Sequence, residues 1–474
     1  MALATTNIAL SPTPGDGLPA SPSRKPERPA FFSNVATVFG GQVACALVAL
    51  AIEICYARLL GPSGRGQVSL CMMIIALCAV VGGVGGEIPL TVWTASQRKH
   101  SSSWLSAVAL VGSLGCITAG ILWTAVYWWW HPAFLRGITP SLAILVFAAI
   151  PLSVFFTYLL ALLTGMERFQ LRAGLTLFSQ LAELAGVLLL VLALGRIAQV
   201  AVTGYLLGLL VAGGIGAFLL QRTLRDAWKP PVSMAEIKAA FNLGVRGLGN
   251  LASFFSYRLD VFVLNYFLDP AHVGWYALGV IISESLWQVP QAAAIALYPR
   301  TARTIDEGAG QFTCFVTRQC LLLAGALGLL MALLSPLLVP LLFGAAFFPS
   351  VAVIWWILPG TIALALGKVM STDITARGRP EFNSMVAVTG GVITVMLDFL
   401  LIPRMGINGA ALASSITYLL EGILIALVLR HLLKVSWRSL LVPTRSDFAA
   451  YRAVWLRGSS RLKSATRPAE SQTV

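Results

Sequence analysis

The feature that most constrains this chain of 474 residues is a series of long apolar segments separated by short polar ones. Twelve segments are long enough to cross a bilayer as a helix, which takes about 20 residues. No polar stretch between them is long enough to fold as a separate soluble domain. The predicted spans are residues 35–57, 67–93, 104–130, 141–163, 169–194, 198–220, 241–267, 274–298, 314–340, 351–372, 384–403 and 409–432.

The composition agrees with a polytopic all-α membrane protein. Hydrophobic residues make up 57% of the chain and charged residues 11%, whereas about 25% of an ordinary soluble domain is charged. Disordered, fibrous and disulfide-rich secreted proteins are thereby excluded. The seven cysteines lie almost all in apolar segments and form no C-x-x-C pair, so we interpret them as small hydrophobic side chains.

The net charge of +14 is distributed as expected for cytoplasmic loops rather than for a nucleic-acid surface. With the N-terminus in the cytoplasm, 24 of the 33 Lys and Arg residues fall on the cytoplasmic side, 5 fall on the opposite side and 4 lie within spans. Short cytoplasmic loops of membrane proteins carry such an excess. The bias predicts that both termini are cytoplasmic, and no nucleic-acid partner is expected.

The longest cytoplasmic loop divides the spans into two groups of six. It ends with Ser233 and Glu236 at the spacing of a capping box, which predicts a short helix leading into the seventh span. The predicted organisation is a disordered N-terminal tail (1–30), an N-lobe (31–220), a linker (221–240), a C-lobe (241–432) and a basic tail (433–474) with an amphipathic helix around Phe448, Tyr451 and Trp455.

The two groups of spans resemble each other. Leu60-Gly61-Pro62 with Gly66 and Leu268-Asp269-Pro270 with Gly274 match at an offset of 208 residues. Two further matches, Gly165 and Phe169 with Gly378 and Phe382, and Tyr205 with Tyr418, share an offset of 213. Because each half has an even number of spans, a repeat predicts two pseudo-symmetric six-helix lobes around a central cavity, with the axis along the membrane normal.

Signatures of covalent catalysis are scarce. The sequence contains no G-x-S-x-G, Walker A or H-E-x-x-H motif, and its four histidines form no metal-spaced pair. The glycines of the segment 82–86 lie in an apolar span, where they favour close packing or local unwinding over phosphate binding. We therefore expect no catalytic residue, metal or cofactor.

Ionisable groups inside the spans are the informative residues, because they are costly in a membrane and usually face protein or water. Lys368 lies near the cytoplasmic end of its span, where it could reach the membrane surface or the cavity. Arg258 lies off the polar face of the seventh span and is expected to reach the outer surface. That face carries Asn242, Arg246, Asn250, Ser253, Tyr257 and Asp260, and the substrate-binding candidates are Arg246, Asn250, Tyr257, Asp260 and Lys368.

A cavity with both cations and carboxylates suits an anionic substrate and a coupling cation. We expect Arg246 to hold a phosphate group. Glu53, Asp260 and Glu284 are the candidates for ion coupling, because a carboxyl group removed from water takes up a proton more readily. Helix packing is the favoured interpretation for three further buried acids, Glu183, Asp398 and Glu421.

Several of these segments resemble the polysaccharide-export flippases of the multidrug/oligosaccharidyl-lipid/polysaccharide superfamily, over about residues 31–432. The resemblance is carried by Tyr257-Arg258-Leu259-Asp260, Phe267-Leu268-Asp269-Pro270, Gly274-Trp275-Tyr276-Ala277, Ala57-Arg58-Leu59-Leu60-Gly61-Pro62 and Glu284-Ser285-Leu286-Trp287.

The resemblance implies a function. Such proteins move undecaprenyl-diphosphate-linked oligosaccharide, a repeat unit of O-antigen, capsule or exopolysaccharide, to the outer leaflet of a bacterial inner membrane by alternating access. Cationic residues in their central cavity would correspond here to Arg246. Protons or sodium ions are the candidate coupling ions, and a glycan polymerase is the candidate protein partner.

Three other functions are weighed against this one. A drug or small-cation antiporter of the same fold would have a cavity dominated by carboxylates and aromatic rings, and Arg246 counts against it. A membrane enzyme that polymerises or ligates glycans would need a large outer loop, but the longest predicted outer loop has only about ten residues. A scaffold that transports nothing is the last alternative.

Overall fold

The computed structural model describes residues 28–95, 103–221, 233–247, 249–303 and 307–443, and every regular element in these ranges is helical. The predicted amphipathic helix around Tyr451 and most of the predicted N-terminal tail lie outside them. The helices are α1 (Arg28–Gly82), α2 (Glu87–Ala95), α3 (Trp104–Phe134), α4 (Pro140–Gly165), α5 (Phe169–Leu194), α6 (Ala198–Leu219), α8 (Met234–Gly247), α9 (Gly249–Phe267), α10 (Pro270–Glu284), η1 (Ser285–Trp287), α11 (Gln288–Arg303), α12 (Glu307–Phe343), η2 (Ala345–Phe347), α13 (Ser350–Ala376), α14 (Glu381–Met405), α15 (Ile407–Leu433) and α16 (Trp437–Leu441).

The described residues include nine helices that are long and apolar enough to cross a membrane, with α1 counted once. The chain is therefore a multi-pass membrane protein, as predicted. Several predicted spans coincide with single helices almost to the residue. The fifth, 169–194, has the bounds of α5, and the fourth and sixth differ from α4 and α6 by one or two residues at an end.

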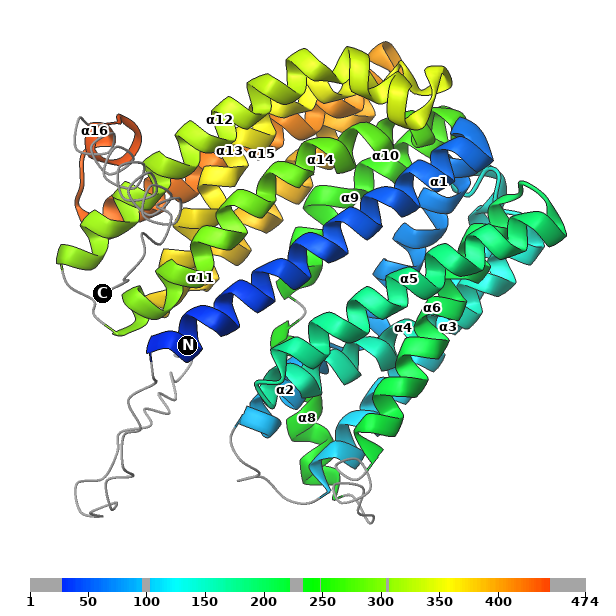
Figure 1. Ribbon diagram of the computed structural model, residues 1–474, viewed down its shortest axis with the longest axis horizontal. Coiled ribbons are helices and arrows are strands. Elements are labelled where there is room, and N and C mark those ends of the chain that lie inside the picture. Colours follow the sequence, from blue (N-terminus) through cyan, green and yellow to red (C-terminus); the bar gives the residue numbers. More distant parts are fainter. Residues whose placement is uncertain (1–27, 96–102, 222–232, 248, 304–306, 444–474) are drawn as a thin grey trace, which may run out of the picture.

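Helix α1 contains the first two predicted spans and a sharp turn between them. Gly61 there has φ 66° and ψ −176°, a conformation that essentially only glycine adopts. Pro62 follows and cannot supply a backbone N–H to continue the hydrogen bonds of the first segment. Figure 1 shows the chain turning back at this point, so α1 consists of two segments, 28–60 and 62–82.

Two predicted spans are interrupted within the described residues. The second predicted span ends at Gly82, and a turn with positive φ at Val84 and Gly85 separates it from α2. This is the local unwinding expected of the glycine segment. It also brings a backbone carbonyl into reach, because the hydroxyl of Tyr158 donates to the oxygen of Gly83 at 2.6 Å.

In the predicted span 241–267 the structure describes α8 up to Gly247 and α9 from Gly249, and residue 248 lies outside the described residues. The prediction of a single α-helix over 274–298 is wrong, because this region comprises α10, the 3₁₀ turn η1 and α11. Pro290 explains that break, since its ring would clash with the carbonyl of Leu286, four residues earlier, in a continuous α-helix.

The linker helix α8 begins as predicted. The Ser233 hydroxyl accepts from the Glu236 N–H at 3.2 Å, and the Glu236 carboxylate accepts from the Ser233 N–H at 3.0 Å, which completes the capping box. Its carboxylate also accepts from the Ser103 hydroxyl at 2.6 Å. Helix α8 packs on α2 and α3, so it lies with the first half of the chain although it leads into the second.

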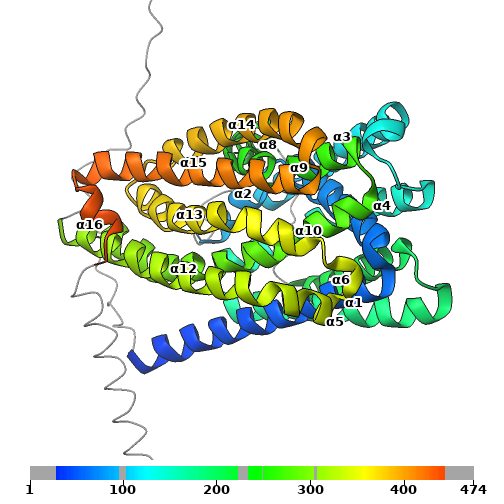
Figure 2. The same cartoon turned by 90° about the horizontal axis from the view of Figure 1, so that it is seen from above.

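The helices form two groups, α2 to α6 with α8 and α9 to α15, and α1 passes between them (Figure 1). Within the second group, α12, α13 and α15 run side by side (Figure 2). The two groups meet at one end of the bundle through the predicted repeat. A side chain on Gly66 would strike the carbonyl of Pro270, and one on Gly274 would strike the carbonyl of Pro62. Such a reciprocal contact is what a two-fold relation produces.

We call the end of the bundle where Gly66 meets Gly274 the closed end. Polar side chains there bond to backbone carbonyls of the opposite half. The guanidinium of Arg58 donates to the carbonyls of Leu341 and Leu342, and the amide of Asn265 donates to the carbonyl of Phe134 at 2.8 Å. These contacts join α1 to α12 and α9 to α3, so both halves contribute donors to the closed end.

Candidate functional site

A cluster of charged and aromatic side chains lies within the second group of helices. Its main ion pair joins α9 to the last residue of α10. The guanidinium of Arg258 contacts both carboxylate oxygens of Glu284, at 3.1 and 2.6 Å, and the Tyr418 hydroxyl donates to the same carboxylate at 3.2 Å. The side chains of Arg258 and Glu284 are 26% and 9% exposed, so the pair is held largely away from the protein surface.

Lys368 on α13 provides a second cation in this cluster. Its ammonium lies 4.2 Å from the ring centre of Trp287 and 5.0 Å from that of Tyr257. Tyr418 contacts both rings, so the three aromatic side chains form one group beside the ammonium. Among the residues that the structure describes, Lys368 has no carboxylate within ion-pair distance. Its charge is stabilised by aromatic faces and remains available to an anion.

The Glu421 carboxylate on α15 faces α9. It accepts hydrogen bonds from the Ser256 hydroxyl at 2.5 Å and from the Tyr257 hydroxyl at 3.2 Å. Gly390 on α14 makes room for it, because a side chain there would meet the carboxylate. Glu421 thus bonds α15 to α9 and packs against α14, and it also orients the Tyr257 ring beside Lys368.

Two aspartates lie deeper in the same half. Asp260 is 1% exposed, and its carboxylate accepts hydrogen bonds from the hydroxyls of Tyr276 and Ser414 and from the N–H of Val261. Asp398 on α14 is fully buried, and neither of its carboxylate oxygens has a hydrogen-bond partner among the described residues. Since buried polar groups are nearly always hydrogen-bonded, Asp398 is the exception that calls for an explanation.

A matching pair of polar contacts lies in the first half. The Arg65 guanidinium contacts the Glu53 carboxylate at 2.6 Å and also donates to the Ser69 hydroxyl. In a straight helix, residues 53 and 65 would lie about 18 Å apart along the axis. The turn at Gly61 is therefore what brings them together. Nearby, the Tyr56 hydroxyl donates to the Glu183 carboxylate at 2.5 Å, which links α1 to α5.

A cavity of about 150 Å³ lies between the two halves and connects these groups. Glu53 and Arg65 of α1 line it together with Arg258 and Asp260 of α9. Glu284 does not line it, but is bound to Arg258, which does. The structure thus brings all three predicted ion-coupling carboxylates to one region, each already paired with a cation or with hydroxyl donors.

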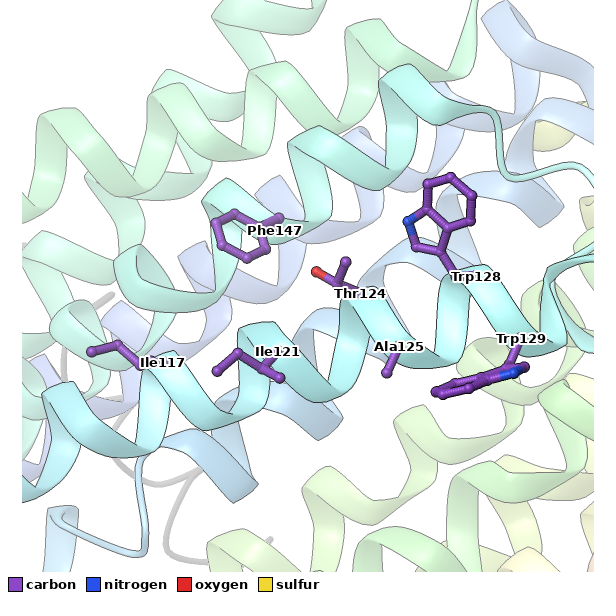
Figure 3. Close-up of a pocket in the computed structure, with 7 residues that line it drawn as sticks. All are labelled: Ile117, Ile121, Thr124, Ala125, Trp128, Trp129 and Phe147. Atoms are coloured by element: carbon purple, nitrogen blue, oxygen red, sulfur yellow. The ribbon is translucent and has the colours of Figure 1, made fainter.

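A larger hollow, of about 700 Å³, lies elsewhere, between α3 and α4 (Figure 3). Its lining is apolar apart from the Thr124 hydroxyl and the indole N–H groups of Trp128 and Trp129, and it contains no ionisable side chain. The two indoles are 80% and 81% exposed at the end of a membrane-length helix, where amphipathic rings of membrane proteins commonly lie at headgroup level. This hollow suits hydrocarbon and is separate from the charged cluster.

Only some of the predicted substrate-binding residues lie in the charged cluster. Tyr257, Asp260 and Lys368 lie in the cluster, and of the two positions left open for Lys368 the structure has the interior one. Arg246 and Asn250 stand at the end of α8 and the start of α9, and their side chains lie outside the described residues. Residue 248 between them also lies outside the described residues, so the polar stripe stays a prediction at this end of the seventh span.

Two cations were misplaced by the sequence analysis. Arg258 does not reach the outer surface as expected, because Glu284 holds it inside. Arg65 is one of the five cations that the predicted topology places on the outer side, yet it is 3% exposed and paired with Glu53. A signal for both was present, since an isolated glutamate within an apolar span requires a cationic partner.

Comparison with known proteins agrees with this architecture. A family model described as "Polysaccharide biosynthesis protein" matches residues 31–305, more than half of the chain. The chain belongs to this family. The resemblance inferred from the residues is confirmed. The family match and the similarity to a curated protein named a flippase support the prediction that the chain is not an enzyme.

One curated relative and two solved structures illustrate the similarity. A probable low-salt glycan biosynthesis flippase of Haloferax volcanii is 23% identical over 392 residues, 81% of this chain and 80% of its own length. A lipid II flippase MurJ in an inward closed conformation superimposes with a TM-score of 0.67 at 16% identity, over 89% of this chain and 92% of that chain.

An inward-facing multidrug resistance MATE transporter of the MOP superfamily also has a TM-score of 0.67, at 17% identity, over 82% of this chain and 94% of that one. At these identities the two structures establish a shared fold. They do not distinguish between a glycan-lipid substrate and a drug.

Proposed function

We propose that the protein is a flippase that moves an undecaprenyl-diphosphate-linked oligosaccharide from the inner to the outer leaflet of a bacterial inner membrane by alternating access. The proposal includes twelve spans in two pseudo-symmetric lobes and cytoplasmic termini. The reciprocal contact of Gly66 with Pro270 and of Gly274 with Pro62 supports the symmetry. The family match and the flippase named among the relatives support the class of substrate.

The observation that carries the proposal is the free ammonium of Lys368. A cation with aromatic neighbours and no carboxylate partner among the described residues is suited to an incoming diphosphate. Arg258 adds a second cation that is already neutralised by Glu284. We therefore assign the first contact with the substrate phosphate to Lys368, with Tyr257 lining the approach and Arg246 and Asn250 retained as candidates on the same path.

For ion coupling we propose the two aspartates of the second half. Asp398 lies within electrostatic range of Asp260 and has two unused oxygens. An incoming proton or sodium ion would relieve the repulsion between two buried carboxylates and satisfy the unpartnered one. Glu53 and Glu284, each held by an arginine, would respond to this change through the cavity that Glu53 and Asp260 share.

The experiment is a leaflet assay in proteoliposomes loaded with undecaprenyl-diphosphate-linked oligosaccharide, in which a membrane-impermeant glycosidase reports the glycan that reaches the outside. We expect Lys368→Met to abolish translocation and Lys368→Arg to retain part of it. Lys238→Met is the matched control, because Lys238 is an exposed lysine on α8 away from the cluster. Equal rates for Lys368→Met and wild type would contradict the assignment of Lys368.

A second candidate function, a drug or small-cation antiporter, is favoured by one observation. Carboxylates and aromatic rings also gather in the cluster, where Glu284 and Glu421 lie beside Tyr257, Trp287 and Tyr418. The same proteoliposomes distinguish the two functions. Efflux of a fluorescent organic cation driven by a proton or sodium gradient, with no translocation of the glycan lipid, would replace the flippase by the antiporter.

A further inference from the structure

One face of α15 is exposed along its length and changes character near its end. Ile416, Leu419, Ile423 and Leu427 are each more than 40% exposed and follow one another at three- or four-residue steps. These steps keep the side chains on one face of the helix. Since α15 is long and apolar enough to span a membrane, this apolar stripe faces hydrocarbon.

The same face continues into basic residues. Arg430, His431 and Lys434 follow Leu427 at steps of three and four residues and line a hollow of about 420 Å³, together with Leu427 and Val435. All three basic side chains are exposed. None of them makes an ion pair with a carboxylate of the described residues. The charge of this hollow is thus not neutralised by a carboxylate of the part of the chain that the structure describes.

The short helix α16 closes one side of the basic end. The guanidinium of Arg430 lies 5.3 Å from the ring centre of Trp437, the first residue of α16. This contact holds the guanidinium beside the hollow and places a half-exposed indole next to it. Tryptophan at the end of a membrane-spanning helix is typical of the headgroup region. The basic residues therefore lie at the depth of lipid phosphates.

We propose that this face of α15 is a binding site for an anionic glycerophospholipid. The phosphate lies in the hollow against Arg430 and Lys434, with His431 at its side, and one acyl chain follows Leu427, Ile423 and Leu419. The apolar stripe commits the site to a lipid, since a free phosphate would use only the basic end. Basic pockets at the ends of membrane helices bind such headgroups. The site lies at the end of α15 remote from the charged cluster.

The test is native mass spectrometry of the full chain in detergent, with added dioleoyl phosphatidylglycerol or zwitterionic dioleoyl phosphatidylcholine. We expect retention of the anionic lipid in preference to the zwitterionic one. Arg430→Gln with Lys434→Gln should weaken that binding about 30-fold, because each cation near a membrane surface contributes a factor of about five. The matched control is Arg168→Gln with Arg379→Gln, which removes two exposed arginines from other helix ends.

Two further measurements, on a charge-conserving variant and with inorganic phosphate, test the assignment to a lipid. Arg430→Lys with Lys434→Arg keeps both charges and should keep the lipid, and a loss as large as in the glutamine variant would mean structural damage and overturn the assignment. Inorganic phosphate tests the other source of the headgroup chemistry. If inorganic phosphate alone displaces the lipid fully, the site recognises phosphate alone and the lipid assignment fails. Equal retention in the glutamine and control variants would also overturn it.

Discussion

Arg258 and Glu284 form a two-point ion pair between α9 and the last residue of α10, immediately before the chain enters the η1 turn. The pair therefore lies at the place where the predicted eighth span is broken. It also sets the position of Trp287, which lies three residues further and contacts Lys368. An ion pair in one half of the protein thus lies beside the aromatic ring that contacts the Lys368 ammonium.

Breaking this pair from one side should be costly. Arg258→Met or Glu284→Met alone leaves an uncompensated buried charge, and we expect each to lower the free energy of unfolding by about 3–5 kcal/mol, whereas the double variant should lie close to wild type. Unfolding titrations in mixed micelles measure all four proteins as a cycle. Arg196→Met, at an exposed position, is the control and should change little. Additive losses in the double variant would show that the pair is not coupled.

The turn within α1 gives a prediction about backbone strain alone. A side chain on Gly61 would meet no atom within 4 Å, so Gly61→Ala tests only the positive φ, and we expect it to destabilise the protein by about 1–3 kcal/mol. Gly174→Ala is the counterpart, because Gly174 is helical and equally uncrowded. That variant should be stabilised by about 0.4–1 kcal/mol. Thermal unfolding of both purified variants would reveal the opposite signs, and equal shifts would refute the strain argument.

The interrupted spans show what the sequence can predict in this protein. The α5 and α6 bounds follow from apolar runs that nothing breaks, so length alone locates them. The breaks at Gly61 and near Pro290 can also be predicted from single residues. Glycine adopts positive φ readily, and proline cannot continue a regular helix. Predicting spans from the length of apolar segments misses the break near Pro290, because proline also occurs within continuous membrane helices.

Which charged side chains pair with each other could not be predicted from the sequence in this way. Arg258 and Glu284 are 26 residues apart, and Tyr56 and Glu183 are 127 apart, so only the packing of different helices brings them together. Helical periodicity describes which residues share a face of one helix and contains no information about the partner helix. For this reason the predicted carboxylates were found near the cavity, while the cations that hold them were assigned to loops or to the outer surface.

The closed end depends on two glycines. Gly66→Val would push its side chain into the carbonyl of Pro270, and we expect the two halves to separate there. In a variant without native cysteines, the thiol introduced by Gln67→Cys should then react several-fold faster with a membrane-impermeant maleimide. Gly325→Val provides the control, because a side chain at Gly325 meets nothing within 4 Å. Unchanged labelling in Gly66→Val would mean that this contact does not keep the end closed.

The attachment of α8 to α3 should depend on pH. The hydrogen bond from the Ser103 hydroxyl, and then that from the Ser233 N–H, lower the pKa of Glu236 below its ordinary value of about 4.3. A lowered pKa means that the stabilisation is fully present above the ordinary value and is lost as the pH falls through the lower one. Hydrogen exchange of the α8 amides should therefore approach that of Glu236→Gln at pH 3 and be slower at pH 6. A constant ratio between the two proteins would exclude this role of the carboxylate.

Asp398 gives the sharpest contrast between stability and function. Because its buried oxygens have no partner among the described residues, Asp398→Leu should raise the free energy of unfolding by about 1–3 kcal/mol. Asp260→Leu should lower it, since the hydroxyls of Tyr276 and Ser414 would lose their acceptor. If Asp398 takes up the coupling ion, the stabilised variant must also lose the dependence of glycan-lipid translocation on a proton or sodium gradient. A stabilised Asp398→Leu protein that keeps this dependence would show that the coupling ion binds elsewhere.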